Sequence, residues 1–386
     1  MNSSLVIRTL PSDDSGTLIG RCWCPTRRRG VPVRLVDHTL VELPERTIAH
    51  VLRDSDPARL VRDVDPKGRW TVCLAEALES IGDPGAPHLL APVDLQPIKA
   101  AGVTFVESML ERVIEEATRG DATIAADART RILDAIGDDV GRLRPGTPEA
   151  LRFRETMLAE DRWSPYLEVG LGPDAEIFTK ASPMSAVGTG MPVGIRSDSD
   201  WNNPEPEVVL ACDPNGRVVG ASLGNDVNLR DWEGRSALLL GRAKDNRSSA
   251  AIGPFIRLFD RHLGGTFDLE TIRTETVTLE VSGEADEFEL EAESSMARIS
   301  RDPADLASQL FDGHDWPDGV VLYLGTMFAP TRDRPRLDGS IVAGDGFTHR
   351  TGDLVRISSP HLGSLENTVR PVADCPRWTG GLADLF

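Results

Sequence analysis

Two glutamates stand directly before an apolar run in the segment NNPEPEVVLACDPNG, residues 202–216. If a strand begins there, Glu205 and Glu207 project to the same face, about 6.5–7 Å apart, because strand side chains alternate. Like charges at that separation repel each other unless a positive group lies beside them. A divalent cation such as Mg²⁺ or Ca²⁺ meets this need, because hard cations prefer carboxylate oxygens. A solvated pair at the rim of a strand is the alternative.

Charged residues downstream favour the metal interpretation. The segment GASLGNDVNLRDWEGRSALLLGRAKDNRSSAAIGPFI, residues 220–256, places Asp226 after a strand-like run. Asp226 supplies a third carboxylate, a ligand set that leaves coordination positions open for a substrate. Lys244 follows, and it is one of four lysines, the others being at 67, 99 and 180. Taken singly, Asp226 is also compatible with an Asx turn, and Lys244 with an ordinary surface lysine.

These residues, in this order, resemble the motifs of the fumarylacetoacetate hydrolase family. Glu-x-Glu is followed by NDV-x-x-RD some twenty residues later, then by a lysine, then by IGPF. The chain ends with GVVLYLGT, in which Leu324 replaces the first Thr of the family's Thr-Gly-Thr, and with GDLVRISSPHLGSLENTV. The similarity covers residues 98–386 or thereabouts.

The resemblance implies a set of roles for the matching residues. Glu205, Glu207 and Asp226 are the metal ligands, and Mg²⁺ (or Mn²⁺ or Ca²⁺) is the cofactor. Lys244 lies beside the metal-bound substrate, and the Thr326 hydroxyl contacts the substrate carboxylate. Arg230 corresponds to a family arginine and is expected to bind substrate, whereas Glu233 stands where many members have glutamine.

One helix departs from the hydrolase pattern. Hydrolytic members carry Asn-Tyr-x-x-His-x-x-Glu, and the matching places in SMLERVIE are taken by Ser108, Met109, Arg112 and Glu115. Arginine cannot accept a proton near neutral pH, so the water-activating His–Glu pair is missing in its usual form. This argues against simple C–C hydrolysis.

The longer segment GVTFVESMLERVIEE, residues 102–116, resembles the family's 2-keto-3-deoxy-pentonate dehydratases. This resemblance implies a metal-dependent hydro-lyase of non-phosphorylative pentose catabolism. The enzyme would convert a small 2-keto acid of the xylonate or arabinonate type to 2,5-dioxopentanoate. A metal that chelates the C1 carboxylate and C2 carbonyl would stabilise the enolate formed when a C3 proton leaves.

For this reaction we expect Glu115 to remove the C3 proton and Lys244 to stabilise the enolate oxygen. Arg112 and Glu111 would orient the base or the sugar hydroxyls, and Ser108 would contact the substrate. An alternative makes Lys244 the base, with its pKa lowered by the cation. Structural roles are also open, because Arg112 can pair with a glutamate one turn along the helix and Ser108 can cap it.

Other functions share parts of this site. A hydrolase of a 2,4-diketo-3-deoxy sugar acid, or an oxo-acid decarboxylase of the same superfamily, needs the same metal triad with a water-activating group opposite. None of the seven histidines lies at the expected helix position, which leaves His361 as the candidate. A non-catalytic sugar-acid-binding protein is disfavoured, because the three carboxylates and Lys244 occur together.

The surrounding elements predict an α+β, mainly β fold with two domains. Residues 1–90 form a small N-terminal α+β domain, and GDPGAPHLLAPVDLQPI, with four prolines, reads as an extended connector. Residues 91–386 form the catalytic domain, a mixed β-sandwich/β-roll of the fumarylacetoacetate hydrolase type by resemblance. It starts with a helix over 108–119, capped by Ser108 and Glu111, followed by helix-like segments over 125–160.

From residue 165 onward the pattern is mainly that of strands. Residues 275–294 alternate with period two on both sides of a turn, which predicts a hairpin with one acidic face. GVVLYLGTMFAP, residues 319–330, predicts a buried strand, and 349–369 predicts further strands. The Cys22-Trp-Cys24 motif is read as strand residues, because no second pair of metal ligands follows it.

Composition restricts the partners of the chain. The 386 residues carry a net charge of −19, which argues against nucleic acid and anionic membranes. No apolar run approaches the ~20 residues that span a bilayer, and no basic, apolar leader opens the chain. Five scattered cysteines suit a reducing cytoplasm. Family resemblance implies a homodimer or a homotetramer.

Overall fold

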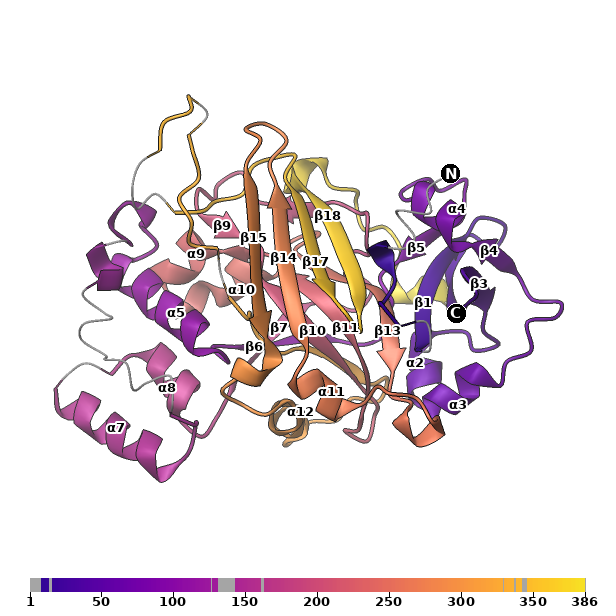
Figure 1. Cartoon of the computed structure of the whole chain (residues 1–386), viewed down its shortest axis with the longest axis horizontal. Coiled ribbons are helices and arrows are strands. Elements are labelled where there is room, and N and C mark those ends of the chain that lie inside the picture. The colour runs from indigo at the N-terminus through magenta and orange to yellow at the C-terminus, as the bar shows by residue number, and fades with distance from the viewer. Residues whose placement is uncertain are drawn as a thin grey trace.

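The structure is a computed structural model that describes residues 8–13, 16–125, 127–130, 143–160, 163–328, 330–336, 338–341 and 346–385. Two large β-sheets form its centre, with helices at their ends and edges (Figure 1). The mainly β, α+β fold predicted from the sequence is confirmed.

The larger sheet has eleven strands. In spatial order they are β4 (Thr71–Cys73), β3 (Thr39–Glu42), β2 (Arg29–Val36), β1 (Thr17–Cys24), β13 (Ala250–Leu258), β11 (Val218–Asp226), β10 (Pro206–Cys212), β16 (Val320–Tyr323), β6 (Ile98–Gly102) and β7 (Glu176–Ala181), with β5 (His88–Leu90) paired to β1. Neighbours are antiparallel except β16 and β6, which run parallel.

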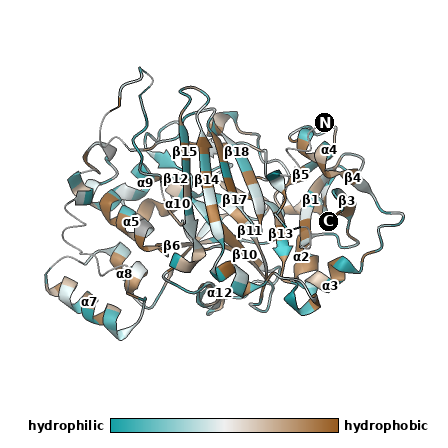
Figure 2. Ribbon diagram, viewed as in Figure 1, coloured by the Kyte–Doolittle hydropathy of each residue, from teal (hydrophilic) through white to brown (hydrophobic). Residues whose placement is uncertain are grey.

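The second sheet packs against one face of the first. Its strands are, in spatial order, β15 (Glu289–Ser295), β14 (Thr276–Ser282), β17 (Leu354–Ser359), β18 (Gly363–Pro371) and β8 (Val193–Ile195). Val208 and Leu210 of β10 share a buried core with Val277 and Leu279 of β14. Strand periodicity explains this core, because alternate residues of each strand are apolar and face inward. The central strands accordingly show brown segments between white and teal ones in Figure 2.

The opposite face of the large sheet is covered near its middle by short helices. Val209 of β10 shares a second core with Ile48 and Val51 of α2 (Ile48–Leu52) and with Val61 of α3 (Pro57–Arg62). Strand β10 is therefore buried on both faces, which accounts for its apolar run from Val208 to Cys212.

The N-terminal region joins the same sheet. Strand β1 pairs with β13, with Thr17 opposite Leu258, and residues of β1, β2, β3, β5 and α4 (Leu74–Glu79) build a third core together with Val72 of β4 and Phe255 of β13. The proline-rich connector contains β5, which pairs with β1. The division into domains at residue 90 stays a prediction.

Helix α5 (Val106–Thr118) begins two residues earlier than the sequence pattern predicts. Its N-cap is Phe105, and no side chain caps the helix. The capping-box prediction is wrong, because the Ser108 hydroxyl lies inside the first turn and donates to Phe105 O at 2.8 Å. Glu111 is also engaged elsewhere, in ion pairs described below. The predicted helix end is confirmed, since Arg119 and Gly120 both adopt positive φ.

Helices α5, α7 (Pro148–Ala159) and α8 (Pro165–Leu171) gather at one end of the molecule, opposite the N-terminal region (Figure 1). Thr147 and Ser164 cap α7 and α8 through their side chains. Part of the predicted helical stretch, residues 126 and 131–142, lies outside the described residues.

The remaining elements connect the sheets. They are α9 (Arg230–Arg235), α10 (Leu240–Lys244), α11 (Leu269–Arg273), α12 (Pro303–Phe311) and the two-stranded pair β9 (Asn202–Asn203) and β12 (Asn228–Leu229). The predicted hairpin is β14–β15, the predicted buried strand contains β16, and the closing strands are β17 and β18, so these expectations are confirmed. Within the described residues, a search for a helix long and apolar enough to cross a bilayer finds none.

Candidate active site

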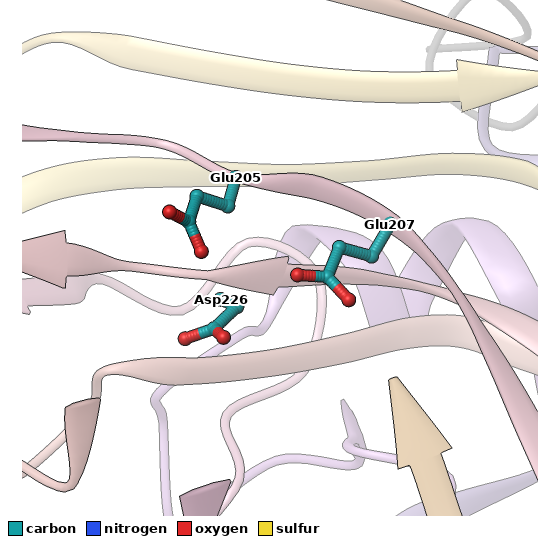
Figure 3. A group of neighbouring side chains, drawn as sticks. All are labelled: Glu205, Glu207 and Asp226. Atoms are coloured by element: carbon teal, nitrogen blue, oxygen red, sulfur yellow. The ribbon is translucent and has the colours of Figure 1, made fainter. Parts of the chain in front are cut away.

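Three carboxylates meet where β10 and β11 run side by side. Glu207 lies in β10, Glu205 lies just before it, and Asp226 ends β11. The register places Glu207 opposite Gly224, and the backbone N–H of Asp226 donates to Glu205 O at 3.1 Å. One oxygen from each carboxylate lies within 4.8 Å of the others, and Figure 3 shows the three carboxylates as close neighbours.

All three carboxylates are buried, with 2% or less of each residue exposed. Burial of like charges is costly, so compensating groups are expected nearby. Lys244 Nζ contacts Glu205 and lies 3.2 Å from Asp226 Oδ2. Lys180 Nζ lies 2.7 Å from Asp226 Oδ1. The site is therefore an array of acids held together by ammonium groups.

The carboxylates differ in their proton affinity. Burial, and then the charges of Asp226 and Glu205, raise the pKa of Glu207 well above its usual value. Burial also raises the pKa of Asp226, but Lys180 and Lys244 outweigh it, so the net shift is downward. A carboxylate that is costly to ionise without a further positive charge is the kind of group that a bound cation satisfies.

The residues present fit a hard divalent cation. Three carboxylate oxygens close together are the ligand type that Mg²⁺, Mn²⁺ and Ca²⁺ take. A backbone hydrogen bond holds Glu207 in place: the N–H of Gly325 donates to Glu207 Oε2 at 2.6 Å. Gly325 has φ +96°, and a Cβ there would lie 2.0 Å from Thr104 Oγ1, so this turn requires glycine.

Helix α5 brings a second charged network to the triad. Arg112 contacts Glu205, and it lies 2.5 Å from Glu115 Oε2 and 2.9 Å from Glu233 Oε2 of α9. Burial lowers the pKa of Arg112, but the carboxylates of Glu115, Glu233 and Glu205 raise it well above its usual value. Arg112 is thus a permanent cation next to a candidate metal ligand.

Behind Arg112, the network continues away from the triad. Arg230 Nε lies 2.5 Å from Glu115 Oε1, and Arg230 Nη2 lies 2.6 Å from Glu111 Oε2. Arg129 Nη2 also reaches Glu111 Oε2, at 2.7 Å. Both Glu115 oxygens are therefore occupied by guanidinium groups.

A small cavity opens onto the triad. It is lined by residues from the β6–α5 segment, β7, β10, β11, α9, α10 and the segment after β16, namely Ala101, Gly102, Val103, Ser108, Arg112, Glu176, Phe178, Glu205, Glu207, Asp226, Glu233, Lys244 and Thr326. Of the predicted substrate-binding residues, Ser108 and Thr326 lie on this lining, whereas Glu111 and Arg230 lie behind it. The predicted base Glu115 also lies behind it.

The structure adds Glu176, Lys180 and Glu233 to the residues around the triad. Glu176 and Lys180 stand at alternate positions of β7 with Phe178 between them, a period-two pattern in EIFTK that could have indicated a shared face. Gly102 makes room for Glu176, because a Cβ on Gly102 would lie 2.0 Å from Glu176 Oε2. Burial raises the pKa of Glu176, and it raises the pKa of Glu233 to about 7.

The position of His361 does not support the alternative in which this histidine activates water. His361 Nδ1 lies 2.7 Å from Glu275 Oε2, and no histidine is among the described residues that line the cavity. Cys22 and Cys24 are buried strand residues of β1 and are free thiols, as are the other three cysteines.

Comparison with known proteins identifies relatives and a shared fold. No protein-family model matches the chain. It is 33% identical over 167 residues to the 2-dehydro-3-deoxy-D-arabinonate dehydratase of Saccharolobus solfataricus, an alignment that covers 43% of this chain and only about half (53%) of that protein. It is 27% identical over 337 residues to a Haloferax volcanii protein named "Probable 2-keto-3-deoxyxylonate dehydratase", covering 87% and 92% of the two chains.

Solved structures agree in fold. A 2-keto-3-deoxy-D-arabinonate dehydratase complexed with magnesium and 2,5-dioxopentanoate superposes with a TM-score of 0.61 at 21% identity, over 92% of this chain and 99% of the other. A fumarylacetoacetate hydrolase from Exiguobacterium antarcticum gives a TM-score of 0.56 at 17% identity over the same shares. At these identities the similarity establishes the fold alone.

Proposed function

The chain has the fold of the fumarylacetoacetate hydrolase family, and from this fold and its site we propose that it is a metal-dependent dehydratase of 2-keto-3-deoxy-pentonates. The reaction removes water from the substrate: a C3–H bond and the C4–OH bond break, and tautomerisation gives 2,5-dioxopentanoate. Substrates are of the xylonate or arabinonate type. The curated relatives, both named as dehydratases of such acids, support this choice.

One observation carries the proposal. The carboxylate triad adjoins a cavity in which the helix position of the hydrolases' histidine is filled by Arg112, a buried guanidinium that forms ion pairs with three carboxylates. A residue held as a cation cannot take a proton from water, but it suits a reaction that needs no nucleophilic water. Elimination meets that condition.

When bound at the triad, a divalent cation supplies Lewis-acid polarisation of the substrate's carboxylate and carbonyl oxygens. Lys244 provides the fixed positive charge beside them. Burial lowers the pKa of Lys244, but Asp226 and Glu205 outweigh it and raise the pKa above its usual value. We assign Lys244 the stabilisation of the enolate oxygen rather than proton removal. A lysine that holds its own proton strongly is a poor base.

Proton removal from C3 requires a carboxylate that faces the cavity. Glu115, the base favoured by the sequence, lies outside the cavity lining and accepts hydrogen bonds from Arg112 and Arg230 with both oxygens. Glu176 lies on the cavity lining, and burial raises its pKa. We therefore favour Glu176 as the base and give Glu115 the role of holding Arg112.

The remaining predicted residues divide by position. Ser108 and Thr326 line the cavity; because their hydroxyls donate to Phe105 O and Phe328 O, they offer acceptor lone pairs to the hydroxyl groups of the substrate. Arg112 faces the cavity and is placed to orient a hydroxyl or carboxylate. Glu111 and Arg230 act on the substrate through the network around Arg112.

The proposal also covers the setting of the enzyme. We propose a cytoplasmic enzyme, consistent with free cysteines, that assembles as a homodimer or homotetramer. Light scattering of the purified chain tests the assembly.

The activity test uses a substrate panel. EDTA-treated protein, with Mg²⁺ restored, is incubated with 2-keto-3-deoxy-xylonate, with its C4 epimer and with a 2,4-diketo-3-deoxy acid, and products are identified by NMR. Formation of 2,5-dioxopentanoate from either epimer supports the proposal. Cleavage of the diketo acid without dehydration of either epimer would replace it with the hydrolase.

A further inference from the structure

We propose that Lys180 is a positioning residue that holds Asp226 as a one-oxygen metal ligand, and so favours a small octahedral cation over a larger one. This inference rests on the proposed metal site, not on the substrate assigned to it. Lys180 is absent from the cavity lining, so it touches no substrate there.

The first support is the contact between the two side chains. Lys180 is fully buried at the inner end of β7, and Asp226 is 1% exposed. Lys180 Nζ lies 2.7 Å from Asp226 Oδ1, whereas Asp226 Oδ2 faces Lys244 Nζ at 3.2 Å. The two carboxylate oxygens thus have different partners: Oδ1 forms an ion pair with Lys180, and Oδ2 accepts a hydrogen bond from Lys244, which lines the cavity.

The second support is that Lys180 is fixed independently of Asp226. Its Nζ donates to Val227 O at 3.2 Å, to Ser249 Oγ at 3.2 Å and to Lys244 O. Ser249 Oγ in turn donates to Lys244 O at 2.7 Å. These three oxygens match the three N–H donors of an ammonium group, so its 2.7 Å contact with Asp226 Oδ1 is an ion pair rather than a fourth hydrogen bond. Lys180 therefore cannot follow Asp226 if that carboxylate rotates.

The same anchor joins both halves of the site. Asp226 ends β11 and Val227 follows it directly, whereas Lys244 ends α10 and Ser249 lies just before β13. A single buried cation ties the backbone of the lysine that faces the cavity to a metal ligand. A neutral side chain of the same length, such as methionine, has neither the positive charge nor the three N–H donors that make these contacts.

Ion preference follows from the number of oxygens on offer. Ca²⁺ takes six to eight oxygens and often binds a carboxylate through both, whereas Mg²⁺ requires about six in a strict octahedron. If Oδ1 stays with Lys180, Asp226 supplies a single oxygen. The site then lacks one ligand that a larger ion would use, and it fits Mg²⁺ or Mn²⁺.

The test measures binding of the metal alone. Isothermal titration calorimetry of EDTA-treated wild-type protein, of Lys180→Met and of the matched control Lys99→Met gives dissociation constants for Mg²⁺ and Ca²⁺. Lys99 lies on the neighbouring strand β6 and donates to Thr179 Oγ1 at 3.0 Å. We expect the ratio Kd(Ca²⁺)/Kd(Mg²⁺) to fall about tenfold or more in Lys180→Met and to stay unchanged in Lys99→Met.

A ratio within about twofold of wild type, in a Lys180→Met protein that unfolds cooperatively, would overturn the inference. If that variant does not fold, a crystal structure of the wild-type protein with Mn²⁺ decides instead: we expect Asp226 to bind by one oxygen with the other on Lys180, and a two-oxygen Asp226 would contradict this. Because no substrate is used, a failed dehydratase assay leaves these outcomes unaffected.

Discussion

Arg112 of helix α5 donates a hydrogen bond to Glu205, one of the three carboxylates of the candidate metal site. Through this contact the helix that departs from the hydrolase pattern is joined directly to the triad. Arg112 also forms ion pairs with Glu115 and Glu233, so its removal leaves three buried carboxylates with less compensation.

Substitution of Arg112 is expected to reduce stability strongly. Arg112→Met should lower the free energy of unfolding by about 3 kcal/mol or more, because loss of one partner leaves buried charges unpaired. Urea denaturation of metal-free protein measures the change. Arg152→Met is the matched control, since Arg152 and Glu149 form an exposed ion pair, and we expect it to change stability by less than about 1 kcal/mol.

Glu233 should make the metal-free protein less stable as pH rises. Burial raises the pKa of Glu233 from 4.5 to about 7, so between these values the folded state binds a proton that the unfolded state has released. Stability is therefore highest below the lower value and is lost as pH rises toward the upper one. This part of the pH dependence, a change in the free energy of unfolding on the order of 1–3 kcal/mol, should be absent in Glu233→Gln. Unfolding curves between pH 5 and pH 8, at roughly half-unit steps, compare the two proteins; parallel profiles would contradict the assignment.

The two candidate bases are separated by isotope exchange. Glu176→Gln should slow exchange of the C3 hydrogens of the keto acid into D₂O by about a hundredfold or more, since it removes the proton acceptor from the cavity. Glu115→Gln should mainly lower the melting temperature, because it weakens the ion pairs to Arg112 and Arg230. NMR follows both exchange rates. Wild-type exchange in Glu176→Gln, with exchange lost in a folded Glu115→Gln, would return the base to Glu115.

Lys244 is expected to act in turnover. Lys244→Met should lower kcat by about a hundredfold or more, because the substitution removes a charge aimed at the developing enolate oxygen. Steady-state kinetics at saturating Mg²⁺ measure the effect, with Lys99→Met as the control for the loss of a lysine. A Lys244→Met enzyme with normal kcat and raised KM would limit Lys244 to substrate binding.

The triad and the main strands could be predicted from the sequence, because their signals are local. Glu205 and Glu207 share a face through strand periodicity. Asp226 follows in the next strand of the same hairpin, so the antiparallel pairing of β10 and β11 brings it beside the two glutamates. The hairpin β14–β15 was equally accessible, since its alternation and turn lie within twenty residues.

Other features depend on long-range packing. Lys180 meets Asp226 because β7, at the edge of the sheet, lies beside the end of β11 and the segment after α10. Glu115 lies outside the cavity lining, where Arg230 of α9 pairs with it. The start of α5 was misplaced for a similar reason: Ser108 resembles a cap in isolation, but Phe105 is drawn into the core between the sheets, and the helix begins there.

Dehydration by wild-type protein and by Glu207→Gln, with and without Mg²⁺, tests the central claim most directly. Formation of 2,5-dioxopentanoate from 2-keto-3-deoxy-xylonate or its C4 epimer is followed by NMR. We predict product from the wild-type protein only when Mg²⁺ is present, and a rate lower by about a hundredfold or more in Glu207→Gln at the same Mg²⁺ concentration. Equal rates after removal of metal, or no product from either epimer, would contradict the account.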